Sequence, residues 1–446
     1  MSTSWLLLLV WSLAAETNAS SWPGFLGAGA GPVTSEELPL EWSPEKNVAW
    51  KADLPGHGQS SPVIFAGRVY VTSIEGPMKE KCHVLAFDLA NGKELWKHTF
   101  ASSDPVKNSV YVSRAAPTPV ADEQSVYCFF ESGDVVALAH DGKVRWSRSL
   151  ANDYGKFKNK FGLAASPVQT ADAIVILADD EGPSYLISLS KSDGKNLWKT
   201  ERKSRVSWSS PALVPFDSNR QVVCSSAGSV DGYDPATGKQ LWSFTDVGGN
   251  TAATPMPVGN GRFLVGASMG REGENAENAK KSNFAMAIET AAGQLAPKVL
   301  WRTEEAMTSF SSPVVVGEYA YWLNRTGVLF CFDMKTGEKK YSQRLKQGCW
   351  ATPFATNDRI YFPGKDGVTS VIATGPEFKL LAENMLWDPE KIKKDPNPGA
   401  GEETEERKKA AANFATPIQY GAAAVPGSLL IRTGEQLVCL RKPATP

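Results

Sequence analysis

Short apolar runs separated by polar turns fill almost the whole chain, and residues 207–247 show this pattern most completely. Ser209-Ser210-Pro211 leads into one apolar run, two more follow at 221–225 and 230–233, and a turn at 234–239 precedes a run that carries Trp242. Gly238 can adopt the positive φ of a tight hairpin, and Asp234 can accept hydrogen bonds from the backbone ahead of it. The stretch predicts a module of four antiparallel strands.

The same module recurs along the chain in eight copies. Each copy starts with a Ser-Pro or Thr-Pro pair: Ser61-Pro62, Thr118-Pro119 (or Pro117), Ser166-Pro167, Ser210-Pro211, Thr254-Pro255, Ser312-Pro313, Thr352-Pro353 and Thr416-Pro417. Glycine turns before the last run are Asn91-Gly92-Lys93, Asp141-Gly142-Lys143, Asp193-Gly194-Lys195, Thr237-Gly238-Lys239 and Thr336-Gly337-Glu338. An aromatic residue follows at one repeat position: Trp96, Trp146, Trp198, Trp242 and Trp301, with Tyr341 in the sixth copy.

Repeats of roughly 40 to 60 residues that contain four short strands are typical of β-propellers. We therefore predict an all-β, eight-bladed propeller over residues 47–442. A proline is tolerated at the start of an innermost strand, because that strand has a free edge facing the channel. The tryptophan is large enough to fill the wedge between blades. It is followed by Lys, Ser or Arg and not by Asp, so the repeats are not of the WD type.

The two ends of the propeller complement each other. Residues 47–54 reproduce the outer strand of a blade with nothing before it, and residues 414–442 supply a Thr-Pro start and about three strands. We expect the N-terminal strand to complete the eighth blade, which closes the ring and removes a free sheet edge.

Three segments lie outside the repeats. Residues 1–19 hold a short apolar run followed by small residues, which is typical of a cleaved secretory signal peptide. Residues 20–46 form a Gly-rich leader that we expect to lie over the propeller. Polar insertions at 270–282 and 387–412 lack apolar periodicity and predict surface loops, with a short exposed helix at 402–412.

Charge and cysteine content narrow the function. The chain has 47 basic and 48 acidic residues and no basic stripe, which argues against nucleic-acid binding. The six cysteines stand at strand positions of mostly different blades, without a C-x-x-C motif, so we expect small buried side chains and no metal site.

Several motifs resemble the bacterial PQQ-like (pyrrolo-quinoline quinone repeat) propeller proteins. They are W-P-x-F-x-G at the start of the leader, L-P-L-x-W-S-P-E-K-N-V-A-W-K at 38–51, G-x-G-x-S-S-P at 56–62 and the D-x-x-T-G-K-x-L-W repeats. The resemblance covers nearly the whole mature chain and implies an eight-bladed propeller. It includes both quinoprotein dehydrogenases and non-enzymatic, BamB-like assembly proteins.

A quinoprotein dehydrogenase of this resemblance would need PQQ, a Ca²⁺-type ion with oxygen ligands, a carboxylate base and, in typical relatives, a vicinal disulfide. The chain has neither a Cys-Cys pair nor a C-x-x-C-H motif. Asp88, Asp234 and Asp333 fall in structural turns. We therefore assign no catalytic, cofactor-binding or metal-binding residue, and PQQ with Ca²⁺ remains the alternative.

A candidate ligand face follows from the propeller topology. The residues just before the Ser/Thr-Pro starts should surround one mouth of the channel, and they are His57, Gln59, Arg114, Trp208, Asn250, Phe310, Trp350 and Phe414. Aromatic groups with one arginine and one histidine suit a flat or extended ligand, such as a peptide strand or a glycan. Alternatively, these aromatic residues plug the channel and contact the neighbouring blade.

The sequence thus favours an exported, periplasmic or secreted monomer that acts as a non-catalytic binding or assembly scaffold of the cell envelope, with an envelope protein or an extended ligand on the propeller face. A PQQ-dependent dehydrogenase or PQQ-binding protein is the main alternative. A polysaccharide-processing enzyme is the third, and it would need paired carboxylates at the mouth, which the sequence does not place.

Overall fold

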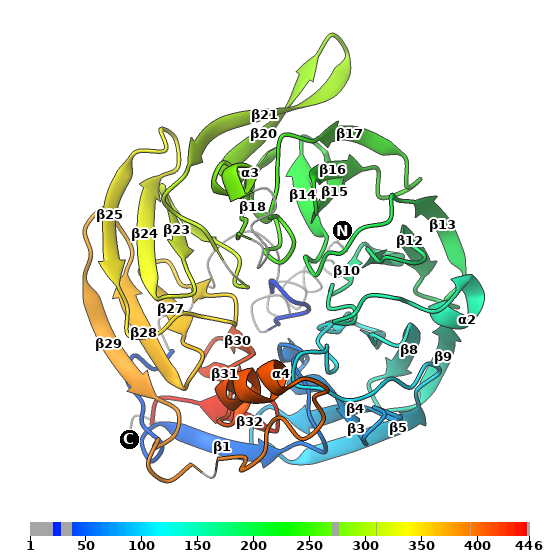
Figure 1. Cartoon of the computed structure of the whole chain (residues 1–446), viewed down its shortest axis with the longest axis vertical. Coiled ribbons are helices and arrows are strands. Elements are labelled where there is room, and N and C mark those ends of the chain that lie inside the picture. Colours follow the sequence, from blue (N-terminus) through cyan, green and yellow to red (C-terminus); the bar gives the residue numbers. More distant parts are fainter. Residues whose placement is uncertain (1–20, 28–37, 270–275, 309, 393, 444–446) are drawn as a thin grey trace, which may run out of the picture.

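Eight four-stranded antiparallel sheets surround a central channel, as the repeats predict (Figure 1). The computed structural model describes residues 21–27, 38–269, 276–308, 310–392 and 394–443. Each repeat becomes one blade, whose first strand lines the channel and whose fourth strand lies at the rim. Strands of alternating direction joined by short turns follow from the short apolar runs and the glycine turns between them.

The strands of the first four blades are β2 (Val63–Phe65), β3 (Arg68–Glu75), β4 (Lys81–Asp88) and β5 (Glu94–Ala101); β6 (Val120–Ala121), β7 (Ser125–Phe129), β8 (Asp134–Ala139) and β9 (Val144–Ser149); β10 (Val168–Gln169), β11 (Ala173–Ala178), β12 (Tyr185–Ser190) and β13 (Asn196–Glu201); and β14 (Ala212–Phe216), β15 (Asn219–Ser226), β16 (Ser229–Tyr233) and β17 (Gln240–Phe244). The helix α2 (Leu150–Tyr154) follows the second blade.

The strands of the next three blades are β18 (Met256–Gly259), β19 (Arg262–Val265), β20 (Asn283–Ala291) and β21 (Gln294–Thr303); β22 (Val314–Val316), β23 (Tyr319–Leu323), β24 (Val328–Asp333) and β25 (Lys339–Arg344); and β26 (Phe354–Ala355), β27 (Arg359–Pro363), β28 (Val368–Ala373) and β29 (Leu380–Met385). The hairpin of β20 and β21 is long and projects from the rim in Figure 1.

The eighth blade closes the ring with strands from both ends of the chain, as predicted. It contains β30 (Gly421–Val425), β31 (Ser428–Arg432) and β32 (Gln436–Leu440), and its outer strand is β1 (Val48–Asp53). Lys51 pairs with Val438 in this antiparallel register. The leading strand therefore covers an edge that would otherwise be exposed.

The repeated tryptophans do more than fill the wedge between blades. Each indole Nε1–H donates a hydrogen bond to a backbone carbonyl at the glycine turn of the next blade: Trp50 to Leu89 (3.0 Å), Trp96 to His140 (2.9 Å), Trp146 to Lys191 (2.9 Å), Trp198 to Pro235 (2.9 Å) and Trp301 to Met334 (2.8 Å). Trp242 is an exception, because the next blade has the long hairpin there, and it donates to Gln221 Oε1 of its own blade (2.6 Å).

The hydroxyl groups before the prolines form a chain of hydrogen bonds around the channel. In six successive steps the backbone N–H of one Ser or Thr donates to the hydroxyl of the next blade: Ser61 to Thr118 (2.9 Å), Thr118 to Ser166 (3.0 Å), Ser166 to Ser210 (2.8 Å), Ser210 to Thr254 (3.0 Å), Thr254 to Ser312 (3.0 Å) and Ser312 to Thr352 (3.4 Å). The proline suits the free edge of the innermost strand, and this chain of bonds accounts for the Ser or Thr before it.

Part of the leader lies inside the channel and not over the propeller, which corrects our expectation for residues 21–27. Trp22 pairs with the free edge of β2 through two backbone hydrogen bonds with Ile64 (2.7 and 2.9 Å), and Pro23 accepts one from Ala121 (3.0 Å). The Trp22 ring contacts Phe354 of the seventh blade with centroids 6.3 Å apart. An unpaired inner edge and an apolar channel wall together favour this docking.

The two insertions form short helices. The second contains α4 (Glu405–Ala410) and the 3₁₀ helix η1 (Ala411–Phe414), which confirms the helix expected there. The first contains α3 (Ala276–Lys280), with Ala279 buried, where only a surface loop was expected. Residues 270–275 and the predicted signal peptide at 1–19 lie outside the described residues. Within the described residues, no helix is long and apolar enough to cross a membrane.

The six cysteines are all buried and unpaired, as predicted. Burial raises the pKa of the Cys224 thiol to about 12, and that of Cys439 to about 11. These thiols therefore act as small apolar side chains of the core.

Candidate ligand face at the channel mouth

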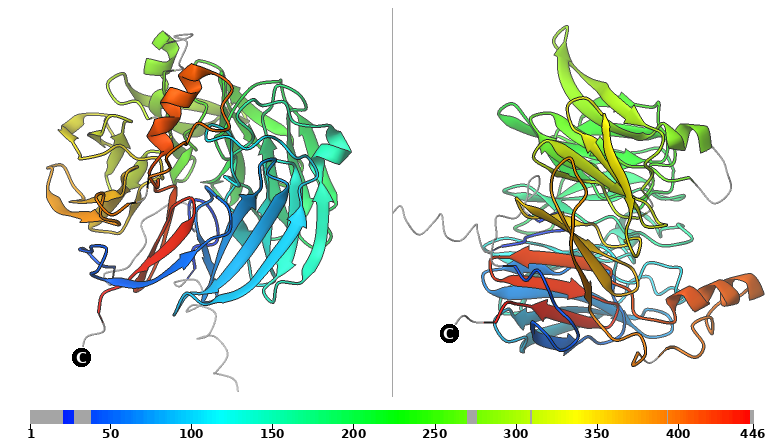
Figure 2. Two further views of the ribbon diagram at one scale, coloured as in Figure 1. Left: turned by 60° about the horizontal axis from the view of Figure 1, so that its bottom comes forward. Right: turned by 90° about the vertical axis from the view of Figure 1, so that its left-hand side faces the viewer.

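One face of the propeller, here called the mouth face, is made by the connections from each fourth strand to the next first strand and by the turns between second and third strands. Strand directions alternate within each blade, so these segments share one face. Residues 387–417, here called the cap segment, connect β29 to β30 on this face. Helix α4 of the cap segment projects from it in Figure 2.

Exposed large apolar side chains are distributed unevenly. Among the described residues there are nine, and four of them lie on the mouth face: Met78, Val106, Met269 and Phe310. The other five lie on the outermost strands of blades: Leu95, Val144, Leu197, Leu300 and Leu380. The glycine turns of the opposite face carry none of the nine, so the mouth face offers the more apolar loops to a partner.

An aromatic cluster on the mouth face is centred on Trp350. Its ring centroid lies 4.9 Å from that of Phe310, 5.5 Å from that of Phe414 and 6.1 Å from that of Tyr420. The Lys365 ammonium lies 5.8 Å above the Trp350 ring. Three residues predicted for the ligand face thus come together from the sixth, seventh and eighth blades. Phe310 is 54% exposed, so the cluster does not only plug the channel.

The cluster continues in two directions. Tyr420 contacts the His57 ring edge-on at 5.7 Å, and Phe414 contacts Tyr111 at 5.3 Å. The prediction missed both tyrosines, because Tyr420 follows its Thr-Pro start and Tyr111 lies three positions before Arg114. Their aromatic character was the only signal in the sequence.

The cap segment is fastened to the connection between the first and second blades. Ser109 Oγ donates to Glu402 Oε1 (2.6 Å), and Tyr111 OH donates to the backbone carbonyl of Arg407 (2.8 Å). Glu402 is only 6% exposed, and the Arg407 guanidinium stacks 5.6 Å from the Tyr111 ring. Because these contacts join distant loops, the cap segment is a docked part of the mouth face and not a loose excursion.

Trp208 lies at the far side of the same surface. Its indole N–H donates to the Gly162 carbonyl (3.0 Å), and its ring meets Phe161 at 6.0 Å. The Arg407 guanidinium lies 5.9 Å from that Phe161 ring, so Trp208 is linked to the cap segment through one intermediate ring.

Two hydrogen bonds join Gln59 to the backbone of Arg114. The Gln59 N–H donates to the Arg114 carbonyl, and the Arg114 N–H donates to Gln59 Oε1, both at 3.0 Å. The flanking residues are also fixed: Lys79 Nζ donates to the Ser113 carbonyl (2.9 Å), and the Glu131 carboxylate accepts from the Ala115 N–H (3.0 Å). The backbone is therefore held in place at the position from which the Arg114 side chain extends.

His57 stands beside two guanidinium groups. Burial lowers its pKa well below the ordinary value, and the nearby charges of Arg114 and Arg432 lower it further. The imidazole is therefore neutral at pH 7. A Cβ added at Gly434 would lie 2.0 Å from the His57 ring, so only glycine leaves room for the ring there.

Asn250 is placed in the blade and not on the ligand face. It is fully buried, and its side-chain amide donates to Ser225 Oγ (3.1 Å) and to the Ser229 carbonyl (3.1 Å), while its oxygen accepts from the Gly228 N–H (3.3 Å). Both ends of the amide are used to shape the turn between β15 and β16, so a ligand would find no donor or acceptor there.

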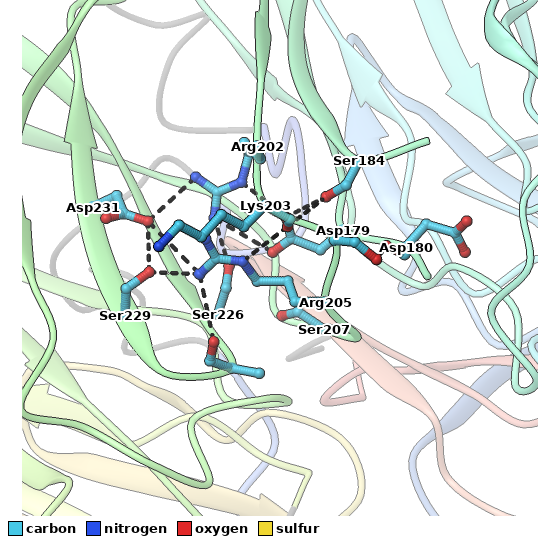
Figure 3. A network of polar contacts seen from close by, with 12 residues as sticks. Asp179, Asp180, Ser184, Arg202, Lys203, Arg205, Ser207, Ser226, Ser229 and Asp231 are labelled. Carbon is cyan, nitrogen blue, oxygen red and sulfur yellow. Dashed lines mark hydrogen bonds and ion pairs between the residues drawn. The ribbon is translucent and has the colours of Figure 1, made fainter. Parts of the chain in front are cut away.

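A buried ionic network joins the third and fourth blades on this face (Figure 3). Arg202 donates from Nε to Asp179 Oδ1 (2.8 Å) and contacts Asp231 Oδ2 at 3.4 Å, and its side chain is 1% exposed. Ser226 Oγ accepts a further bond from the guanidinium (2.9 Å). Because every charge has a partner here, the network fixes the blades and offers no open site.

The turn carboxylates Asp88, Asp234 and Asp333 do accept bonds from the backbone of their own turns, as expected. In the part of the chain that the structure describes, no group of three or more His, Cys, Asp or Glu side chains could hold a metal ion.

A family model described as "Outer membrane protein assembly factor BamB" matches residues 40–161, 155–267 and 286–377, which together exceed half of the chain. The chain belongs to this BamB family. No curated protein matches the chain.

Solved structures that resemble this chain include a BamB protein and also quinohemoprotein dehydrogenases. BamB from Moraxella catarrhalis is 13% identical with a TM-score of 0.57, and the match covers 90% of this chain and 98% of that one. Quinohemoprotein alcohol dehydrogenase from Comamonas testosteroni is 12% identical with a TM-score of 0.58, covering 97% and 83%. ADHIIG, a quinohemoprotein alcohol dehydrogenase from Pseudomonas putida HK5, is 13% identical with a TM-score of 0.56, covering 97% and 83%. At such identities the likeness shows the fold alone.

Proposed function

We propose that this BamB-family propeller is an exported, non-catalytic scaffold of the cell envelope that binds an envelope protein on its mouth face. The observation that carries the proposal is the combination of exposed apolar loops with the aromatic cluster around Trp350 on that face. Large aromatic side chains on a rigid support are the usual anchors of protein interfaces. The description of the matching family, an outer membrane protein assembly factor, agrees with such a role.

The position of the cluster also supports a protein partner. Phe310, Trp350 and Tyr420 come from three different blades, and the 54% exposure of Phe310 leaves the cluster open to solvent. Broad, partly apolar surfaces with aromatic residues at the centre suit proteins better than small molecules.

Site-specific photo-crosslinking tests the proposal with matched positions. A photoreactive phenylalanine replaces Phe310 on the mouth face or Leu197 on an outer strand, two side chains that are both 54% exposed. In intact cells we expect a crosslink from position 310 to a protein that mass spectrometry identifies as an envelope component, and a much weaker one from position 197. Equal crosslinking at both positions, or capture of proteins from outside the envelope alone, would contradict the proposal.

The PQQ-dependent alternative is tested separately by thermal-shift titration with PQQ and Ca²⁺, alone and together. A ligand at a hundred times its dissociation constant adds about 2.7 kcal/mol to the native state. A saturable rise in melting temperature that is lost in Trp350→Ala would favour the quinoprotein. A flat titration would leave the scaffold as the better hypothesis.

A further inference from the structure

Three buried nitrogen atoms at the channel mouth have no hydrogen-bond partner among the described residues. They are Nε of Arg114, Nε of Arg432 and Nε2 of His57. A Cβ added at Gly58, the residue after His57, would lie 2.0 Å from Nη2 of Arg432, and the backbone N–H of Gln59, one residue further, donates to the Arg114 carbonyl (3.0 Å), so the three residues lie near one another. Arg114 is 8% exposed and Arg432 is 0% exposed. Buried polar nitrogens are nearly always bonded in native proteins, so a group of three that are not calls for an explanation.

The two guanidinium groups also have no counter-ion in the described part of the chain, since no ion pair joins either of them to a carboxylate there. Glu131 lies against the loop of Arg114, but its carboxylate is bound to Lys79 Nζ (3.2 Å) and to the Ala115 N–H. Burial lowers the pKa of Arg432 to about 9, which still leaves it charged at pH 7. Two buried positive charges without a negative one are unfavourable unless an anion joins them.

The surrounding structure holds this arrangement rigidly. Arg432 donates to the backbone carbonyl of Ser60 (3.1 Å) and to that of Thr72, which fixes the guanidinium between the eighth and first blades. Arg114 belongs to a loop in which three successive residues are each hydrogen-bonded through their backbone, yet Nε of its side chain has no hydrogen-bond partner among the described residues. His57 is fitted beside Gly434 and Tyr420. A rigid frame with unused donors is what an anion site requires.

We propose that Arg114, Arg432 and His57 form an oxyanion-binding site at the channel mouth, between the eighth, first and second blades, which takes a carboxylate or a phosphate group. Arg114 keeps some exposed surface and donates to the anion, as guanidinium groups do to carboxylates and phosphates. Arg432 supplies a fixed positive charge behind it, and neutral His57 donates from one ring nitrogen. The site goes beyond the proposed scaffold role, because it would bind an anion whichever protein docks on the mouth face.

The test uses the purified full chain without its signal segment and inorganic phosphate or acetate, each compared with sodium chloride at equal ionic strength. Isothermal titration gives the affinity, and the histidine Cε1–H resonances in NMR report the position. We expect saturable binding that shifts the His57 resonance and leaves His98 unchanged. Arg114→Gln should weaken binding at least ten-fold, whereas Arg220→Gln, which removes an exposed arginine of β15, should change it less than two-fold.

Stability measurements separate a binding role from a structural one. In chloride, Arg114→Gln should melt at the same temperature as the natural chain or higher, because it removes an unpaired buried charge, but phosphate should stabilise it less. A loss of stability in chloride with unchanged phosphate binding would overturn the site, as would the absence of any shift of the His57 resonance. Tighter binding of phosphate than of acetate would identify a free phosphate as the ligand, and the reverse a carboxylate. Crosslinking from position 310 does not depend on either result, so the scaffold proposal and the anion-site proposal can be refuted independently of each other.

Discussion

The contact between a tryptophan and the glycine turn of the next blade makes a sharp prediction about Gly194. This residue has φ +73°, and a Cβ placed on it would lie 2.6 Å from Cε3 of Trp146. Carbon atoms prefer a separation of about 3.5 to 4.0 Å. The Trp146 ring cannot retreat freely, because it is 9% exposed and its Nε1–H is bonded to the Lys191 carbonyl. Gly194→Ala must therefore strain both the turn and the ring.

Two costs add in this variant, and the chain offers a control for one of them. A non-glycine residue in the left-handed region costs about 1 to 2 kcal/mol, and overpacking typically costs about 1 to 3 kcal/mol. Gly228 has φ +82° but no atom within 4 Å of an added Cβ. We expect Gly228→Ala to lower the free energy of unfolding by about 1 to 2 kcal/mol and Gly194→Ala by about 2 to 5 kcal/mol.

Urea unfolding followed by far-UV circular dichroism measures both variants, and agreement with tryptophan fluorescence checks that a two-state analysis is valid. Combining Gly194→Ala with Trp146→Leu isolates the clash, because without the indole only the cost of the positive φ remains. In that background we expect the glycine substitution to cost as much as Gly228→Ala does. Equal losses for Gly194→Ala and Gly228→Ala in the natural background would show that the ring does not press on the turn.

Three further predictions concern other contacts between blades. Ser210→Ala removes the hydroxyl that accepts from the buried Ser166 N–H, so it should destabilise the chain by about 1 to 3 kcal/mol in urea unfolding, and Ser210→Thr should restore most of the loss. Ser109→Ala removes the hydroxyl that donates a hydrogen bond to Glu402. It should raise the rate of proteolysis within the cap segment while the unfolding midpoint of the propeller stays unchanged. Arg202→Met removes the one cation that is paired with the buried Asp179 carboxylate among the described residues, while Asp231 keeps its contact with Arg205 (4.0 Å). It should cost about 3 to 5 kcal/mol, with a loss under 1 kcal/mol arguing that the network is solvated.

The repeats allowed the fold to be predicted from the sequence, because each repeat contains the residues that make its own turn and strand contacts. Gly238 and Asp234 mark a turn by local chemistry alone, and Trp242 marks a rim strand by its place after that turn. The bond partner of each tryptophan was not readable, since it belongs to the next blade. Trp242 illustrates the difference: it looks like the other four in sequence, but the long hairpin beside it removes the usual carbonyl.

Contacts between distant segments could not be predicted from the sequence for the same reason. Ser109 and Glu402 are 293 positions apart, and nothing in a polar insertion indicates which loop it will meet. Trp22 likewise gave no sign that it would pair with Ile64 inside the channel. Both contacts depend on the closed ring, which places remote loops side by side only after all eight blades have formed.

The candidate site shows how far topology alone can place a function. The rule that residues before the Ser/Thr-Pro starts surround the mouth brought Phe310, Trp350 and Phe414 into one cluster. The rule did not distinguish Asn250 from Arg114. The Asn250 amide is hydrogen-bonded within its own blade, whereas Nε of the Arg114 guanidinium has no hydrogen-bond partner among the described residues. The position of a residue in the repeat determines on which face of the propeller it lies. Its hydrogen bonds to neighbouring residues determine whether its side chain can still bind a ligand. Arg114 is available because Gln59, Lys79 and Glu131 hold the backbone around it and leave its side chain unused.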